Sequence, residues 1–284
     1  MTRVEVPQRP GAYRWWYVDA SCGDFTVVAI FMIGSLFSPR YAVTGLRGAA
    51  PSAHAAVNFA LYRGGARRLW ALSEYDGVEA SADGLRIGGS ELRYDGDRAR
   101  LSIVERTAPW GTPFEASIEL GAEGPGMAPV ELVAGLSHRW QPIAPRARAR
   151  VKVLGLELDA VAYHDGNFGD VPLGTDLRGW EWERRCTGAL TEIVYQPWGS
   201  EALHVEAGER GVAVRRGAAD EVRRSRTAWG LDVPRGSSVL ESSPFYARWA
   251  GDAHVVGEVA DFARFRSPWI RWMARLRTRM ERAA

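Results

Sequence analysis

The sequence predicts an all-β protein made of two barrel-like or sandwich-like halves, with one amphipathic helix at its C-terminal end. Short runs of β-branched and aromatic residues recur along most of the chain, and glycine-containing turns separate them at close intervals. Only the tail has apolar residues at helical spacing. A chain of 284 residues is long enough for one large domain or for two of ordinary size.

The N-terminal half is predicted to be a meander of short strands. The run 25–33 is continuously apolar and rich in β-formers, which indicates a strand covered on both faces. Gly64 and Gly65 lie between the runs 57–62 and 69–75, and this spacing predicts a hairpin. The other strands of this half are expected at 11–19, 85–87, 91–94, 100–106 and 114–120.

A connection rich in glycine and proline, 121–129, is the predicted boundary between the halves. We therefore expect an N-terminal β-domain over 1–125 and a C-terminal β-domain over 126–284 that carries the helix. The second half repeats the rhythm of short strands. Its strands are expected at 148–154, 154–165, 179–184, 190–196, 202–207, 212–216, 228–233, 245–250 and 255–262.

The end of the strand at 154–165 is the predicted centre of the chemistry. Gly166 is expected to end this strand in a turn. Because side chains alternate along a strand, Tyr163 and Asp165 should lie on one face and His164 on the other. A phenol and a carboxyl would then face the same space. The alternative is that Asp165 only caps the turn, a position where aspartate is common.

Twelve tryptophans are unusual for this length, and several are grouped. Large aromatic side chains fill the cores of β-proteins. Groups of them also form walls that face a large apolar ligand or a sugar. We assign to such a wall, as substrate-binding residues, Trp15, Trp16, Tyr17, Trp180, Trp182 and Asn167. Core packing is the alternative for the aromatic residues, with Asp19 paired to an arginine, and a structural role is the alternative for Asn167.

Several function classes have no support in the sequence. A formal net charge of +2 provides no field that would favour nucleic acid. The histidines occur singly and lack the spacing of metal ligands, so no metal site is expected. No nucleophile elbow, Walker loop or dinucleotide-binding glycine motif is present. A glycosidase stays open, with Asp165 working beside Asp19 or Glu181.

The tail from Pro268 to Arg282 is the predicted helix. Pro268 suits a first helical position, and apolar side chains recur at helical spacing opposite arginines. The apolar set is Trp269, Trp272, Met273, Leu276 and Met280. Such a helix either packs on the barrel or lies on an anionic membrane surface. No run approaches the ~20 apolar residues that span a bilayer. We therefore expect a cytoplasmic protein, either free or peripheral on the inner membrane.

Five motifs together resemble the carotenoid 1,2-hydratases, also called hydroxyneurosporene synthases, of purple phototrophic bacteria. The motifs run from Gly11 to Ala20, Gly34 to Tyr41, Asn58 to Tyr62, His138 to Pro145 and Tyr163 to Gly169. They occur in the same order, and the resemblance extends from Gly11 to at least Trp198. Cys22 and Gly23 depart from members that carry an acidic residue there.

The resemblance implies a lipocalin-like two-domain β-fold and a cofactor-free reaction. Water would add across the terminal C1–C2 double bond of an acyclic carotenoid, such as neurosporene or lycopene, and form a tertiary 1-hydroxy product. The catalytic aspartate of the family falls on Asp165 in a Tyr-x-Asp motif, its tyrosine on Tyr163 and an upstream tryptophan on Trp140. A cyclase with the same protonating aspartate and a lipocalin-type carrier of an apolar ligand are the alternatives.

The residues agree with this chemistry. Protonation of an unactivated alkene needs a carboxylic acid, yet at a pKa of ~3.9 only about one Asp165 in a thousand is protonated at pH 7, a deficit of roughly 4 kcal/mol. Burial among aromatic side chains raises the pKa of a carboxyl because it disfavours the charged form. The faces of Trp140, Trp180, Trp182 or Tyr163 would stabilise the cation by about 2 kcal/mol when desolvated.

Overall fold

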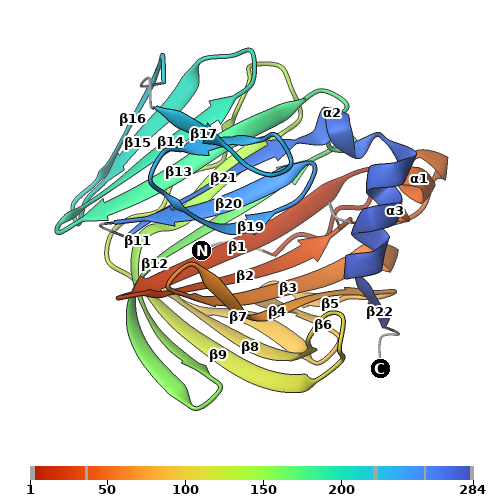
Figure 1. The fold of residues 1–284 in the computed structure, drawn as a ribbon, viewed down its shortest axis with the longest axis horizontal. Coiled ribbons are helices and arrows are strands. Elements are labelled where there is room, and N and C mark those ends of the chain that lie inside the picture. The colour runs from red at the N-terminus through yellow and green to blue at the C-terminus, as the bar shows by residue number, and fades with distance from the viewer. Residues whose placement is uncertain (1–3, 36–37, 220–222, 253, 282–284) are drawn as a thin grey trace.

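The computed structural model describes residues 4–35, 38–219, 223–252 and 254–281. It confirms the all-β prediction, because two large and mainly antiparallel sheets contain most of the described chain (Figure 1). Within those ranges no helix combines the length and the apolar character that a membrane crossing requires. Leu36 and Phe37 of one motif, and Arg282 of the predicted helix, lie outside the described residues.

The first sheet has thirteen strands and curls into a half-barrel (Figure 1). Its order is β22-β4-β3-β2-β1-β12-β11-β9-β8-β7-β6-β5, and β10 pairs with β11. The curl brings β4 back to β8, where the Tyr75 hydroxyl donates hydrogen bonds to Glu105 at 3.1 Å. The strands are β1 (Tyr13–Cys22), β2 (Phe25–Ile33), β3 (Ala55–Arg63), β4 (Ala66–Tyr75), β5 (Glu79–Ser81), β6 (Gly84–Ile87), β7 (Ser90–Asp95), β8 (Arg98–Arg106), β9 (Pro113–Ala122), β10 (Val130–Glu131), β11 (Arg139–Val153), β12 (Leu156–Gly169) and β22 (Arg279–Glu281).

The second sheet has seven strands in the order β16-β15-β14-β13-β21-β20-β19 and packs against one face of the first. A separate two-stranded sheet pairs β17 with β18. The strands are β13 (Gly179–Thr187), β14 (Leu190–Pro197), β15 (Ala202–Ala207), β16 (Val212–Gly217), β17 (Arg224–Arg226), β18 (Asp232–Pro234), β19 (Ser238–Ser242), β20 (Tyr246–Gly251) and β21 (Val255–Asp261).

Helical segments are short. Between β2 and β3 lie α1 (Tyr41–Thr44), η1 (Gly45–Arg47) and η2 (Pro51–His54), and near the C-terminus lie α2 (Phe262–Phe265) and α3 (Pro268–Arg277). Pro268 begins α3 as predicted, but the helix ends at Arg277 because Thr278 takes an extended conformation. The next residues form β22, which pairs in parallel with β4. The prediction of a helix as far as Arg282 was therefore too long.

The face of α3 that packs on the protein also differs from the prediction. Ile270 and Ala274 pack against the core between the sheets, whereas Trp269 and Trp272 are exposed. The helix lies across one end of the two sheets (Figure 1), and its two tryptophans are more than half exposed.

Two other details differ from the predictions. Gly166 does not end a strand, because β1 and β11 pair with it on both sides and β12 continues to Gly169. Most of 228–233 forms a turn, and only its last two residues belong to β18. The chain leaves the first sheet after Gly169 and joins the second at Gly179, so β11 and β12 complete the sheet of the N-terminal strands. The division into domains at residue 125 stays a prediction.

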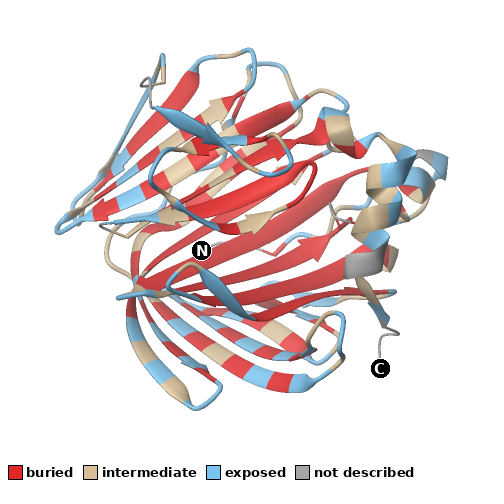
Figure 2. Ribbon diagram, in the orientation of Figure 1, coloured by how far each residue is buried: buried red, intermediate tan, exposed pale blue. Residues whose placement is uncertain are grey.

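The central strands are buried on both faces, and each face has its own core (Figure 2). Inside the half-barrel most core residues are aliphatic, such as Val18, and a few are aromatic, such as Phe31 and Phe59. Between the two sheets the core is rich in aromatic residues and includes Trp140 and Tyr163. Alternation along β1 and β12 therefore divides their side chains between two different interiors.

Candidate active site

Strands β1, β12 and β11 bring the predicted residues together on the face between the sheets. Tyr17 pairs with Asp165 across β1 and β12, and Trp15 pairs with Asn167. On the other side of β12, Asn167 pairs with Trp140 of β11. Since directly paired residues project to the same face, these side chains converge. Tyr163 and Asp165 share this face, as the alternation predicted.

The carboxyl group of Asp165 is the centre of a buried hydrogen-bond network. Its Oδ2 atom accepts hydrogen bonds from the Trp140 indole and the Tyr163 hydroxyl, each at 2.7 Å. Its Oδ1 atom accepts one from the Asn167 amide at 3.1 Å. Asp165 is 3% exposed and Trp140 is fully buried. The network holds the carboxyl in one orientation and leaves Oδ1 with room for a proton.

Burial dominates the electrostatics of this carboxyl. Removal from water raises the pKa of Asp165 to about 8, against the hydrogen bonds from Tyr163 and Trp140, which lower it. The charges of Glu258 and Asp19 raise it further. Burial also raises the pKa of the Tyr163 phenol well above its ordinary value. Near neutral pH the site therefore holds a protonated carboxyl beside a neutral phenol, which is an arrangement suited to proton donation.

Aromatic rings from the second sheet cover the network. Trp182 lies with its ring centroid 5.1 Å from that of Tyr163, and Tyr195 lies 5.2 Å from Trp140 in an edge-on arrangement. Trp180 stacks on Trp15 at 6.0 Å. The predicted wall thus contains Trp15, Trp180 and Trp182, and Tyr195 belongs to it although the sequence did not single it out.

Two further residues extend the network beyond Asn167 and were not predicted as part of the site. His138 contacts the Asn167 amide oxygen through Nε2 at 3.3 Å, and the Tyr13 hydroxyl lies 2.6 Å from His138 Nδ1. Burial lowers the pKa of His138 to about 4, so its ring is neutral. The available signal was alternation, because His138 lies two residues before Trp140, and Tyr13 lies two before Trp15.

Three buried donors near Asp165 have no hydrogen-bond partner among the described residues. They are the Tyr17 hydroxyl and the indole N–H groups of Trp180 and Trp182. Buried polar groups are normally satisfied, and each such exception calls for a ligand or a water. Tyr17 is the cross-strand neighbour of Asp165, and its ring lies 5.6 Å from Trp182. The surroundings of Asp165 therefore contain donors for an oxygen as well as apolar rings.

Some predicted residues do not join the site. Trp16 lies on the opposite face of β1, in the core of the half-barrel, because it alternates with Trp15 and Tyr17. Asp19 is on the correct face, but its Oδ1 atom forms a buried ion pair with Arg184. Glu181 pairs with Arg224 at 2.6 Å. Both carboxylates are thus engaged by arginines, which argues against the glycosidase alternative because it needs a second free carboxyl group.

Comparison with known proteins is consistent along nearly the whole chain. The family described as "Carotenoid hydratase CrtC" matches residues 29–284. The acyclic carotenoid 1,2-hydratase of Thiocapsa roseopersicina is 31% identical over 304 residues, covering 95% of this chain and 74% of that protein. The acyclic carotenoid 1,2-hydratase of Rubrivivax gelatinosus is 30% identical over 285 residues, covering 90% of this chain and 69% of that protein.

Among solved structures, an AttH protein from Nitrosomonas europaea has a similar fold. The TM-score is 0.55 at 13% identity, and the match covers 91% of this chain and 97% of the AttH chain. At this identity the likeness concerns the fold alone.

Proposed function

The chain belongs to the carotenoid hydratase family, and from that premise we propose that it adds water to the terminal C1–C2 double bond of an acyclic carotenoid, such as neurosporene or lycopene, with Asp165 as the proton donor. The enzyme class is that of the hydro-lyases. The role proposed for Asp165 rests on one observation: its carboxyl group is buried among aromatic rings, and its pKa is raised to about 8.

In the proposed reaction the O–H bond of Asp165 breaks and a C–H bond forms at C2, using the π electrons of the double bond. The positive charge then develops at C1, which carries two methyl groups. Water attacks C1, and its surplus proton returns to the Asp165 carboxylate. One alkene and one water thus become one tertiary alcohol, and the enzyme returns to its starting state. Oδ1 is the donor oxygen in this proposal, since Oδ2 already accepts two hydrogen bonds.

The surroundings of Asp165 supply the other needs of the reaction. The faces of Tyr163 and Trp182 lie next to each other and can stabilise a tertiary cation by about 2 kcal/mol in a desolvated site. The unpartnered Tyr17 hydroxyl is the proposed holder of the attacking water. Tyr163 has the different task of orienting Asp165, because its hydroxyl already donates to Oδ2.

The test is incubation of the purified protein with lycopene or neurosporene in detergent micelles containing H₂¹⁸O, followed by mass analysis. The wild type is expected to form a labelled tertiary alcohol and Asp165→Asn to form none. Asp159→Asn is the matched control, because Asp159 lies on the same strand with a largely exposed side chain. Label incorporation by Asp165→Asn at the wild-type rate would contradict the role of this residue.

The same experiment separates the alternatives. A carrier would bind the polyene and leave it unchanged in the wild type and in both variants. A cyclase would give an isomer of the substrate that contains no ¹⁸O. Either product pattern from the wild type would overturn the hydratase proposal.

The second part of the proposal concerns contact with a membrane. Trp269 and Trp272 are 56% and 57% exposed on α3, and the exposed arginines Arg266 and Arg275 lie close by in the chain. Exposed tryptophans beside cations are typical of helices that lie in the headgroup region of anionic bilayers. Such a surface would place the protein where an apolar substrate dissolves.

Flotation with lipid vesicles tests this contact. The wild type is expected to bind vesicles of phosphatidylcholine with phosphatidylglycerol, and the double variant Trp269→Ser, Trp272→Ser is expected to lose most of that binding. Trp110→Ser is the control, since Trp110 is 87% exposed in the turn between β8 and β9. Equal flotation of the wild type and the double variant would refute the contact.

A further inference from the structure

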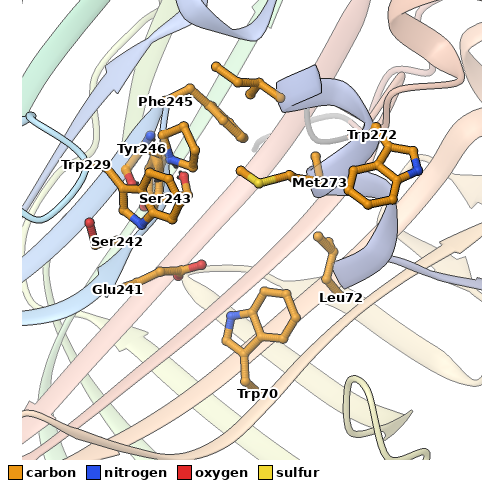
Figure 3. Close-up of a pocket in the computed structure, with 13 residues that line it drawn as sticks. Trp70, Leu72, Trp229, Glu241, Ser242, Ser243, Phe245, Tyr246, Trp272 and Met273 are labelled. Carbon is orange, nitrogen blue, oxygen red and sulfur yellow. Dashed lines mark hydrogen bonds between the residues drawn. The ribbon is translucent and has the colours of Figure 1, made fainter. Parts of the chain in front are cut away.

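An apolar cavity of about 340 Å³ lies beside α3 at one end of the sheets. Trp70 and Leu72 of β4 form one wall, and Met273 of α3 points into the space opposite them, while the Trp272 ring at the rim is turned away (Figure 3). Phe245 closes the inner end. The volume is in the range of small-molecule pockets, which are roughly 300–1,000 Å³ and mainly apolar. Asp165 does not line it, so its function needs a separate account.

Strand register relates this cavity to Asp165. Asp165 pairs with Tyr17, Tyr17 with Ile30, Ile30 with Asn58, and Asn58 with Leu72. The five residues form one row across β12, β1, β2, β3 and β4 and share the face between the sheets. Neighbouring strands lie about 4.8 Å apart, so the row spans about 19 Å. The cavity at Leu72 therefore lies within the length of a long linear molecule from Asp165, measured across the strands.

We propose that the cavity beside α3 binds the distal part of a long acyclic polyene whose terminal double bond lies at Asp165. This inference rests on the proposed function, because it takes its substrate class from there. A carotenoid is several times longer than its terminal isoprene unit, so most of it must lie beyond Asp165 in apolar surroundings. The cavity lies in the same aromatic core as the rings around Asp165.

The segment between the two places is compatible with a conjugated chain. The Arg248 guanidinium lies 5.3 Å from the Tyr246 ring, which lines the cavity, and 5.8 Å from the Tyr17 ring, which neighbours Asp165. Ion pairs with Glu241 at 3.5 Å and Glu258 at 3.4 Å hold this arginine in place. Two carboxylates therefore balance the charge of this arginine, and two aromatic rings cover it, between Asp165 and the cavity.

The cavity on the other side of α2 is a weaker candidate. Its volume is similar, about 300 Å³, but its lining is more polar and includes Ser35, Thr175 and Arg271. It lies against Tyr13 and is separated from Asp165 by His138 and Asn167. An apolar chain would leave these polar groups without water or partners, at a cost of about 1–3 kcal/mol each. Filling the more polar cavity is therefore the control for filling the cavity beside α3.

The test fills each cavity with one tryptophan, in an Asp165→Asn background that binds polyene without converting it. Ala274→Trp fills the cavity beside α3, and Ala42→Trp fills the more polar one. Binding of lycopene from micelles is followed by the change in its absorbance. Ala274→Trp is expected to raise Kd roughly tenfold, equivalent to about 1.4 kcal/mol, and Ala42→Trp to leave it within about twofold.

Thermal unfolding identifies a variant that has lost its fold, in which case Met273→Trp replaces Ala274→Trp at the same wall. Equal lycopene affinity with and without the filled cavity would overturn the inference. Failure of the proposed function would give a different result. The protein with Asp165 intact would bind lycopene but produce no labelled alcohol, and Ala274→Trp would still weaken the binding. In the active enzyme the same filling is expected to raise KM for lycopene more than it lowers kcat.

Discussion

The two faces of the pair β1 and β12 bury different chemistry. The face toward the half-barrel carries Val18, Ala20 and Ala162 and packs in an aliphatic core. The face toward the second sheet carries Tyr17, Tyr163 and other aromatic residues around polar groups. Aliphatic packing stabilises the fold through the area it removes from water. The aromatic face instead holds a carboxyl out of water, which marks it as a candidate functional site.

Adjacent residues of β12 give the largest contrast between the faces. Asp165→Asn is expected to lower kcat/KM by about 10²–10⁴, the usual contribution of a general acid. His164→Gln, on the other face, should keep turnover within about threefold. It should cost about 1–3 kcal/mol of unfolding free energy, because the Tyr94 hydroxyl or the Tyr17 carbonyl loses its partner. Steady-state rates and urea unfolding of both variants measure the contrast.

A comparable rate loss in His164→Gln would break the comparison, since it would mean that the half-barrel face also contributes to the chemistry.

Phe59→Ala tests the core inside the half-barrel without touching the face between the sheets. Phe59 is fully buried and packs on Phe114 with ring centroids 5.5 Å apart. The variant is expected to lose about 3–5 kcal/mol of unfolding free energy, by lost transfer energy and a new cavity. Turnover per folded molecule should stay unchanged at temperatures well below the transition. A fall in kcat of the folded fraction would show that the two faces are coupled.

The pH dependence of the rate tests the aromatic face. Since the proposed mechanism uses the acid form of Asp165, kcat/KM is expected to fall as pH rises through about 8. The Trp140 hydrogen bond favours the carboxylate and lowers this pKa, so Trp140→Phe should move the falling limb to higher pH. Trp182→Phe is the control, because its indole N–H has no hydrogen-bond partner among the described residues. In Trp182→Phe the fall of kcat/KM should occur at the same pH as in the wild type.

The raised pKa of Asp165 also predicts how stability depends on pH. The pKa of Asp165 is about 8 in the folded protein and ~3.9 in the unfolded chain. The unfolded chain therefore releases this proton first, and the contribution of Asp165 to stability declines as pH rises from about 4 to about 8. Asp165→Asn should remove that decline, and Asp159→Asn should not. Urea midpoints across this pH range, compared with those of the wild type, measure it; identical slopes would contradict the raised pKa.

Alternation along single strands was predictable from the sequence, and so was the face on which each side chain lies. The pairing between strands, and the contacts that depend on it, were not. Alternation correctly placed Tyr163 and Asp165 on one face, and it also separates Trp15 from Trp16, although grouping by proximity had joined them. Gly166 looked like a strand end because glycine is a turn residue, and its pairing with Trp16 of the distant strand β1 leaves no local signal. Partners such as His138 and Asn167 are 29 residues apart in sequence, so no local pattern reports their contact.

The tail shows the same limit. Helical spacing identified α3 and its start, but it could not indicate that β4 would offer a free edge to residues 279–281. Edge pairing then ended the helix earlier than the periodicity suggested. The choice of Ile270 and Ala274 as the packed face likewise depends on the second sheet, whose position the sequence does not encode locally.

The pairing of β1 with β12 also has a consequence for the order of synthesis. Tyr17 and His164, which meet across these strands, are 147 residues apart in sequence. Until Leu156–Gly169 has left the ribosome, β1 can pair only with β2 and exposes a free edge rich in tryptophan and tyrosine. Free edges of apolar strands are sites of aggregation. The strand pair that forms the candidate active site thus also leaves an aggregation-prone edge on the nascent chain until β12 has been synthesised.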